Sequence, residues 1–123
     1  MTADSAPVPS QDLLRAERRG VPRYSFSTSV MLTETTRGTR LPARTSELGL
    51  NGCYIDTLEP FPVGTPVWIR IFKDREVFES AGRVLYSHPG IGMGVLFVDP
   101  KPDQRPVLER WLADLAARTS PNP

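Results

Sequence analysis

Three arginines lie close together near the start of the chain, in the segment RRGVPR at residues 18–23. Arg19 and Arg23 are four residues apart, but Gly20 and Pro22 disfavour a helix between them, so an irregular segment must hold both. Guanidinium groups form paired hydrogen bonds with phosphates and with planar ligands, and an irregular arm can fold two of them around one ligand. The segment is therefore a candidate anion or nucleotide clamp. The alternative is a solvated basic linker ahead of the first strand.

The composition indicates one small domain. The chain has 123 residues, of which 39% are hydrophobic and 24% are charged, and two domains would each bury too little surface. A net charge of +1 provides no broad basic field of the kind that binds nucleic-acid polymers, so an anion site must be local. The single cysteine, Cys53, excludes an intrachain disulfide and a zinc site built on several thiolates. No metal site is expected.

We expect no signal peptide and no membrane span in this sequence. The first ten residues lack the charged start and apolar core of a signal peptide, and no apolar run approaches the length of a membrane span, about 18 residues. We therefore expect a cytoplasmic protein that does not insert into a membrane. Residues 1–16 are expected to form a flexible tail with a candidate short helix that Ser10 would cap, residues 17–118 the domain, and residues 119–123 a disordered tail.

Short apolar runs separated by 13 prolines and 9 glycines predict a mainly β domain of strands and turns. The clearest strand runs from Tyr24 to Leu32, where residues alternate between an apolar and a polar face. Six strands with hairpin spacing predict a small closed antiparallel barrel. The other five strands are expected from Leu41 to Thr45, Cys53 to Ile55, Val67 to Phe72, Val77 to Ser87 and Ile91 to Val98.

Two further features complete the predicted fold. Gly92 and Gly94 lie within the last strand and permit a close approach of other groups or local curvature. His88 is expected in the turn before that strand, as a turn residue and not as a catalytic base. After Pro102, Asp103 is expected to cap a helix that packs on the barrel through residues at helical spacing. These residues are Val107, Leu108, Trp111, Leu112 and Leu115.

The order of these parts resembles the PilZ domain, the bacterial receiver module for cyclic diguanylate (c-di-GMP). The resemblance covers residues 17–115. It is carried by the arm and strand at residues 18–26, the small-residue turn that ends in residues 52–55, the strand that contains residues 82–84, and residues 92–97 followed by an amphipathic helix. It implies a six-stranded PilZ-type barrel that binds c-di-GMP between the arginine arm and the loop after the second strand. It implies no catalytic residue and no cofactor.

The second motif of the family reads Asp or Asn, any residue, Ser, two residues, Gly, and this chain departs from it. Alignment on the strand that follows places Glu47 in the acidic position, Gly49 in the serine position and Gly52 at the closing glycine. A second register, through Ser46–Gly49, keeps the serine but places Arg44 in the acidic position. The first register keeps the following strand intact and is preferred.

The resemblance thus assigns six residues to ligand binding. An arginine fork matches the O6 and N7 acceptors of guanine, and a carboxylate can accept from the N–H donors on the opposite edge. Gly49 has no hydroxyl to donate, so binding should be weakened and not abolished. The six residues are Arg18, Arg19, Arg23, Glu47, Gly49 and Gly52.

Three functions remain open from the sequence. The first is a receiver that binds c-di-GMP and relays the binding to an unidentified partner protein. The second is a degenerate PilZ-type interaction domain that no longer binds nucleotide, for which Gly49 is the main support. The third is a small barrel that binds single-stranded nucleic acid, which the near-neutral charge and the few candidate stacking residues disfavour.

Overall fold

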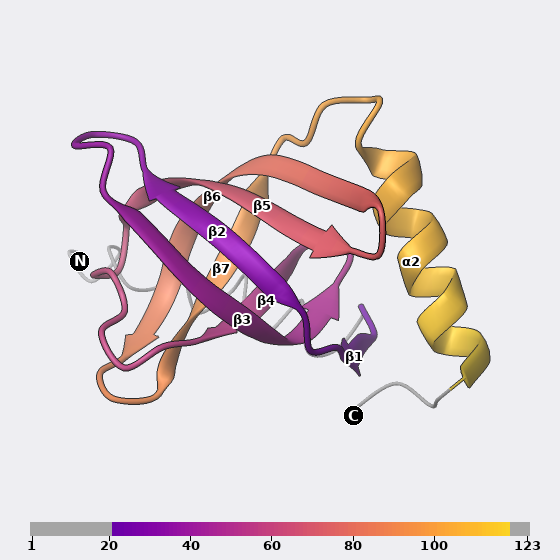
Figure 1. Ribbon diagram of the computed structural model, residues 1–123, viewed down its shortest axis with the longest axis horizontal. Helices are drawn as coiled ribbons and strands as arrows, with labels where there is room; N and C mark the ends of the chain where they lie inside the picture. Colours follow the sequence, from indigo (N-terminus) through magenta and orange to yellow (C-terminus); the bar gives the residue numbers. More distant parts are fainter. Residues whose placement is uncertain (1–20, 119–123) are drawn as a thin grey trace, which may run out of the picture.

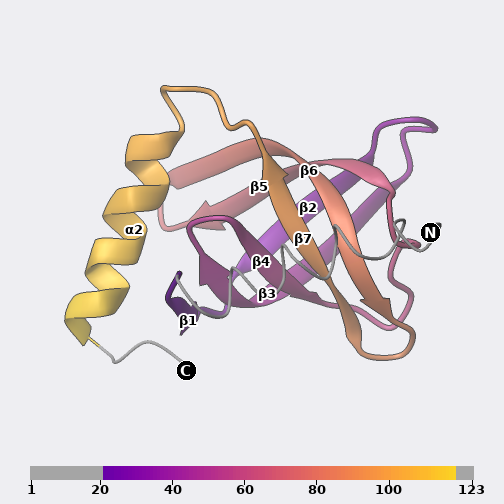
Figure 2. The ribbon, with the colours of Figure 1, turned by 180° about the vertical axis from the view of Figure 1, so that it is seen from behind.

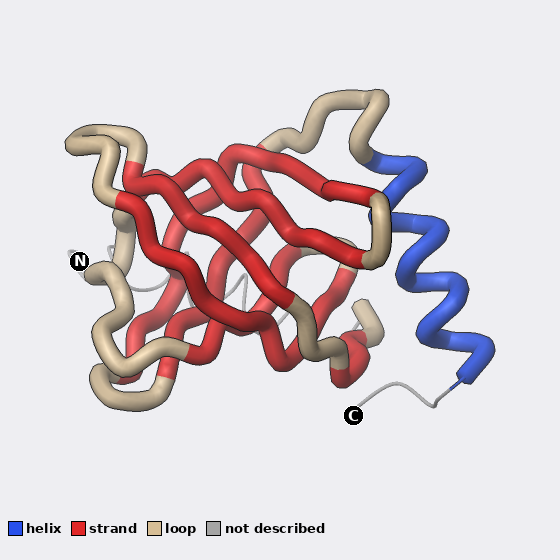
Figure 3. Tube along the Cα trace, viewed as in Figure 1, coloured by secondary structure: helices blue, strands red, loops and turns tan. Residues whose placement is uncertain are grey.

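The structure is a computed structural model that describes residues 21–118. In this part of the chain seven strands precede one helix (Figures 1 and 3). The expected helix that Ser10 would cap, together with Arg18 and Arg19, lies outside the described residues. The elements are β1 (Arg23–Ser25), β2 (Ser29–Glu34), β3 (Arg40–Gly49), β4 (Gly52–Asp56), β5 (Pro66–Lys73), β6 (Glu76–His88), β7 (Gly92–Val98) and α2 (Arg105–Arg118).

The strands form a closed antiparallel barrel. They are hydrogen-bonded in the order β1-β3-β2-β5-β6-β7-β4, and β4 also pairs with β3, which closes a ring of six strands. The seventh strand, β1, pairs with the end of β3 next to this ring. Helix α2 stands at one end of the barrel (Figure 1). The prediction of a mainly β, six-stranded antiparallel barrel with a C-terminal helix is confirmed.

The first predicted strand is divided in two. We expected one strand from Tyr24 to Leu32, but residues 26–28 separate β1 from β2. Both strands pair with β3, with Ser25 opposite Glu47 and Ser29 opposite Arg44, so that three residues on one side face two on the other. This extra residue is a β-bulge, which interrupts the ladder and bends the strand.

Thr45 satisfies the backbone at this interruption. Its side chain is fully buried, and its hydroxyl donates to the carbonyl oxygen of Phe26 over 2.7 Å. The hydroxyl oxygen of Thr45 in turn accepts from the backbone N–H of Thr28 over 3.2 Å. Buried polar groups of the main chain need such partners, because an unpaired one costs about 1–3 kcal/mol. Thr45 of β3 therefore stabilises the bulge. The alternation of apolar and polar residues in the sequence does not predict this bulge.

The inward-facing side chains of the strands form one core that α2 closes. Trp111 and Leu108 of the helix are 1% exposed, and the ring of Trp111 lies 5.9 Å from that of Phe26. Full burial of one large apolar side chain stabilises the fold by roughly 1.5–3 kcal/mol. The core comprises Phe26, Val30, Leu32, Leu48, Cys53, Ile55, Val67, Ile69, Ile71, Phe78, Val84, Met93, Val95, Phe97, Leu108 and Trp111.

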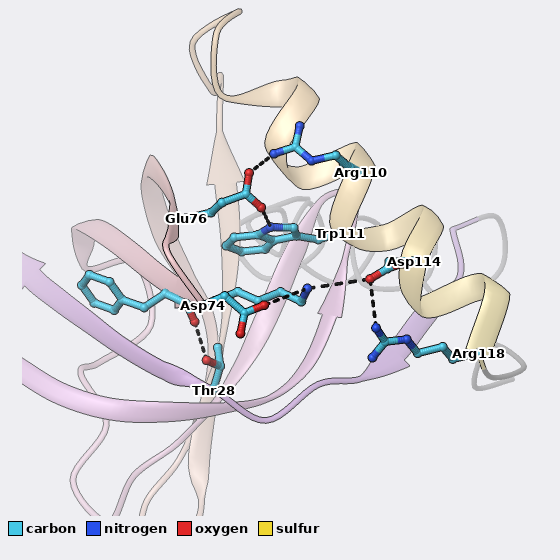
Figure 4. A network of polar contacts seen from close by, with 9 residues as sticks. Thr28, Asp74, Glu76, Arg110, Trp111, Asp114 and Arg118 are labelled. Carbon is cyan, nitrogen blue, oxygen red and sulfur yellow. Dashed lines mark hydrogen bonds and ion pairs between the residues drawn. The ribbon is translucent and has the colours of Figure 1, made fainter.

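Polar contacts fix the helix on the turn between β5 and β6 (Figure 4). The indole N–H of Trp111 donates to Glu76 over 2.9 Å, and Arg110 pairs with the other oxygen of the same carboxylate. The Lys73 ammonium lies 3.8 Å from the carboxylate of Asp114. Exposed ion pairs contribute little, whereas a buried indole needs a partner for its N–H. Glu76 therefore orients the helix through Trp111.

The helix begins later than expected. Asp103 was expected to cap it, but α2 starts at Arg105, and the first helical bond runs from the N–H of Leu108 to the carbonyl oxygen of Gln104. The side chain of Gln104 accepts from the backbone N–H of Glu79 in β6 over 2.8 Å. The sequence predicted a helix that begins directly after Asp103. In the structure Gln104, the residue before the helix, contacts β6, and the helix begins after it.

Substitution of Thr45 by valine tests the role of its hydroxyl. Valine keeps the shape but leaves the carbonyl oxygen of Phe26 and the N–H of Thr28 without this partner, so the free energy of unfolding should fall by about 1–3 kcal/mol. Urea denaturation measures this difference. The control is Thr33→Val on the outer face of β2, which should change it by less than about 0.5 kcal/mol. Equal losses in the two variants would show that the hydroxyl does not stabilise the bulge.

Candidate functional site

The described residues of the expected site meet where β1, β3 and the start of β4 come together. Arg23 in β1 lies opposite Gly49, and Ser25 lies opposite Glu47. A guanidinium nitrogen of Arg23 donates to a carboxylate oxygen of Glu47 over 2.5 Å. Their side chains are 20% and 34% exposed, so the pair is partly shielded but can be reached from solvent. An arginine fork and a carboxylate therefore lie side by side on the barrel surface.

A register shift in β3 turns Glu47 outward. Thr45 and Leu48 are both fully buried, so strict alternation after Thr45 would have pointed Glu47 into the core. The pairing with β4 shifts between Thr45 and Glu47 and leaves Ser46 as the extra residue. Glu47 then lies opposite Tyr54 of β4, and opposed residues share one face of a sheet. The irregularity thus places the carboxylate beside Arg23.

Gly49 lies beneath the stem of Arg23. A Cβ atom at this position would be 3.1 Å from Cγ of Arg23 and 3.2 Å from the carbonyl oxygen of Pro22. The described glycines with positive φ lie elsewhere in the chain, so backbone conformation does not require glycine here. The restriction is the close approach of β1. A serine at this position would displace the arm by a few tenths of an ångström.

The closing glycine of the motif begins a strand, as the preferred register requires. Gly52 is the first residue of β4, is buried, and lies opposite Leu96 of β7. Arg44, which the second register would place in the acidic position, lies on the other side of the register shift. It pairs opposite Asp56, and its guanidinium donates to the hydroxyl of Ser27 over 3.2 Å. The structure brings Gly52, and not Arg44, to the corner with Arg23.

Tyr54 is a neighbour of the site to which sequence analysis gave no role. Its hydroxyl lies 3.2 Å from Nδ1 of His88. Burial, and after it the nearby Tyr86 and Asp56, raises the pKa of Tyr54, so its side chain stays a neutral phenol at neutral pH. The alternation of β4 places Tyr54 on the same outer face as Glu47. That alternation is the signal that could have identified it.

Other single-residue expectations have mixed outcomes. Cys53 is buried and belongs to the hydrophobic core. His88 is the last residue of β6, whereas we expected it in the turn. Within residues 21–118 no three His, Cys, Asp or Glu side chains gather as a metal site would require. No helix in the same range is long and apolar enough to cross a membrane.

Comparison with protein families gives one match that covers most of the chain. The model described as "PilZ domain" matches residues 14–114. Sixteen chains of solved structures also match, and three of them are described below; no curated protein sequence matches the chain.

The first of these structures, the inhibitor of motility MotI/DgrA of Bacillus subtilis, is 11% identical with a TM-score of 0.68. The alignment covers 84% of this chain and 53% of MotI, so the chain spans about half the length of that protein. The PilZ domain of YcgR from Escherichia coli, solved with c-di-GMP, is 17% identical with a TM-score of 0.68 and coverage of 82% and 93%. The PilZ domain of CeSA from a cellulose-synthesizing bacterium is 20% identical with a TM-score of 0.60 and coverage of 76% and 97%.

A double-mutant cycle measures how strongly Arg23 and Glu47 stabilise the fold. Because both side chains are partly exposed, we expect a coupling free energy of about 0.2–1 kcal/mol, decreasing as salt is added. The cycle compares the free energies of unfolding of Arg23→Gln, Glu47→Gln, the double variant and the parent chain in urea. A coupling free energy above about 3 kcal/mol would contradict this expectation and would show that the ion pair is essential for the stability of the fold.

Proposed function

Since the chain belongs to the PilZ domain family, we propose that it is a receiver that binds c-di-GMP without transforming it and relays the binding to a partner protein. The observation that supports this most is the contact between Arg23 and Glu47 on the outer face of the barrel. Both residues lie beside Gly49 and Gly52, at the root of the segment that carries the other two arginines.

The chemistry of guanine suits this pair of side chains. The O6 and N7 atoms of guanine accept from an arginine fork, and the N–H groups on its other edge donate to a carboxylate. Arg23 and Glu47 are close enough to contact one ligand from two sides. In this proposal Arg18 and Arg19, which lie outside the described residues, supply further donors to the phosphates.

The departure at Gly49 weakens this site. A hydroxyl bonded to a charged group contributes about 1.5–3 kcal/mol, which corresponds to about a ten- to hundredfold change in affinity. Gly49 cannot supply that bond, so this receiver should respond at higher nucleotide concentrations than a chain with serine there. Glycine does allow β1 to lie close to β3, where a Cβ atom would press on Arg23.

The relay to a partner would pass from the arm to α2. A shallow hollow lies between helix α2 and the segment around β1. It is lined by Val21, Pro22 and Tyr24, by Leu50 of the β3–β4 turn and by Leu112 of α2. A ligand that shifts the arm as it contacts Arg23 and Glu47 would therefore alter the packing against the helix. The exposed side of α2 is then the surface from which a partner could read the change.

We also propose the boundaries of the receiver in the sequence and its place in the cell. Residues 17–118 form the receiver, flanked by tails at 1–16 and 119–123. Cys53 is the single cysteine of the chain, so no intrachain disulfide is needed, which is compatible with a reducing compartment and supports a place in the cytoplasm.

Gly49 also supports a second function, that of a PilZ-type domain that docks another protein and binds no nucleotide. The side chain of Arg23 packs over Gly49, in the place where the family's serine would stand. In that reading the arm is a fixed part of a protein surface. Nucleotide titration separates the two.

Replacement of Arg23 by alanine tests the proposed site. We expect the affinity for c-di-GMP, measured by calorimetry, to fall more than about tenfold, because a charge-assisted contact is lost. Arg23→Lys should also bind poorly, since an ammonium cannot reproduce the planar fork. The control is Arg70→Ala, which removes an exposed arginine from β5 and should leave the affinity unchanged. If Arg23→Ala and Arg70→Ala both bind as the parent does, the site assignment is wrong.

A serine at position 49 distinguishes the two functions. If the chain is a receiver, Gly49→Ser should tighten c-di-GMP binding by up to about tenfold, near the lower end for one such bond, because crowding of Arg23 offsets part of the gain. A melting curve of the variant shows whether it remains folded. Should neither the parent nor a folded Gly49→Ser variant bind at millimolar nucleotide, the receiver function is rejected in favour of protein docking.

A further inference from the structure

A row of residues extends from the candidate site across the outer face of the barrel. Glu47 of β3 lies opposite Tyr54 of β4, Tyr54 lies opposite Gly94 of β7, and Gly94 lies opposite Tyr86 of β6. The strands β4, β7 and β6 are neighbours in this face (Figure 2). Since opposed residues share one face, the carboxylate and the two tyrosines form one row around the curved outer face.

Two glycines of β7 provide the floor beneath the tyrosine rings. A Cβ atom on Gly94 would be 2.3 Å from the ring of Tyr86, and one on Gly92 would be 2.7 Å from the ring of Tyr54. The rings therefore lie against the backbone of β7, where any side chain would lift them. This is the close approach that glycine at 92 and 94 was expected to allow.

A second irregularity turns Tyr86 to this face. Val84 is buried, so strict alternation would have placed Tyr86 in the core as well. The pairing of β6 with β7 shifts between Val84 and Tyr86, and Leu85 is the extra, buried residue. Bulges of this kind re-aim side chains and are common beside binding sites. Both ends of the row, Glu47 and Tyr86, thus owe their outward direction to a register shift.

The row carries a cluster of three rings. The ring centres of Tyr54 and Tyr86 are 6.1 Å apart, and that of His88 lies 5.4 Å from Tyr86 and 6.3 Å from Tyr54. Tyr54 and Tyr86 are partly exposed and His88 is exposed. The hydroxyl of Tyr54 and Nδ1 of His88 are in hydrogen-bonding distance, which holds the two rings in place. The result is a shallow aromatic surface with no side chain of β7 between its rings.

We propose that Tyr54, Tyr86 and His88 form a stacking platform for the second guanine of a cyclic dinucleotide whose first guanine contacts Arg23 and Glu47. The inference rests on the proposed function and specifies how the same ligand lies across the barrel. Neighbouring strands are about 4.8 Å apart, so β4, β7 and β6 lie roughly 5, 10 and 14 Å from β3 when the distance follows the curved wall of the barrel. That span suits a ligand with two bases and exceeds what one mononucleotide would need.

The platform also explains how a site without the family's serine can bind. Stacking of a base on an aromatic side chain is worth about a 5- to 100-fold gain in affinity. This gain is comparable to the loss that Gly49 causes. The aromatic rings need no charge, which fits a chain with a net charge of only +1.

Calorimetric titration of the full chain with c-di-GMP tests the platform. Tyr86→Ala should weaken binding by about 5- to 100-fold, whereas Tyr86→Phe, which keeps the ring, should stay within about twofold of the parent. The matched control is Phe72→Ala, which removes a partly exposed ring from the outer face of β5, outside the row. If Tyr86→Ala does not fold, Tyr86→Leu covers Gly94 with an apolar side chain that cannot stack and should show the same loss.

A proton spectrum of the bound nucleotide provides a second reading. The two guanine H8 protons are equivalent in free c-di-GMP, and in the complex one of them should move upfield under the ring current of Tyr86. That shift should be absent with Tyr86→Leu. If the parent chain binds c-di-GMP and the Tyr86→Ala or Tyr86→Leu variant binds it equally tightly, the platform is rejected and the proposed function is retained. If the parent chain does not bind at millimolar c-di-GMP, the proposed function fails and the platform falls with it.

Discussion

Strand β3 hydrogen-bonds with three strands, and the register shift at Ser46 determines which of its side chains reach the surface. Before the shift, Thr45 faces the core and satisfies the backbone of the bulge between β1 and β2. After it, Leu48 faces the core and Glu47 faces solvent beside Arg23. One extra residue in the β3–β4 pairing therefore presents a carboxylate to the arm. Without it, Glu47 would be a buried charge with a large desolvation cost.

Stability and function use separate parts of this small domain. The core and the docking of α2 through Trp111 hold the barrel, whereas the proposed ligand contacts lie on its outer face. The contact between Arg23 and Glu47 is partly exposed, so its two side chains can exchange partners at modest cost. The glycines of β7 leave the neighbouring surface without side chains of their own. A planar ligand can therefore lie on the sheet without disturbing what holds the fold together.

The sequence predicted the features that depend on local chemistry. Alternating apolar residues and turn residues identified the barrel strands, and helical spacing identified α2. Alternation could not reveal the bulges, because one extra residue reverses the face of every residue after it. For this reason the outward direction of Tyr86 and the break after Ser25 were missed. The start of α2 was misplaced because Gln104 contacts β6, a partner distant in sequence.

Chemical shifts of the ¹⁵N-labelled chain during titration with c-di-GMP test the central claim most directly. The side-chain Nε–H of Arg23 and the backbone amides of Glu47, Gly49 and Gly52 should shift together and reach saturation, because the ligand contacts the corner of β1, β3 and β4. Amides in the β2–β3 hairpin, at the far end of the barrel from α2, should not move (Figure 1). Absence of saturable shifts at millimolar nucleotide, or shifts that gather at that far end, would contradict a nucleotide site at Arg23 and Glu47.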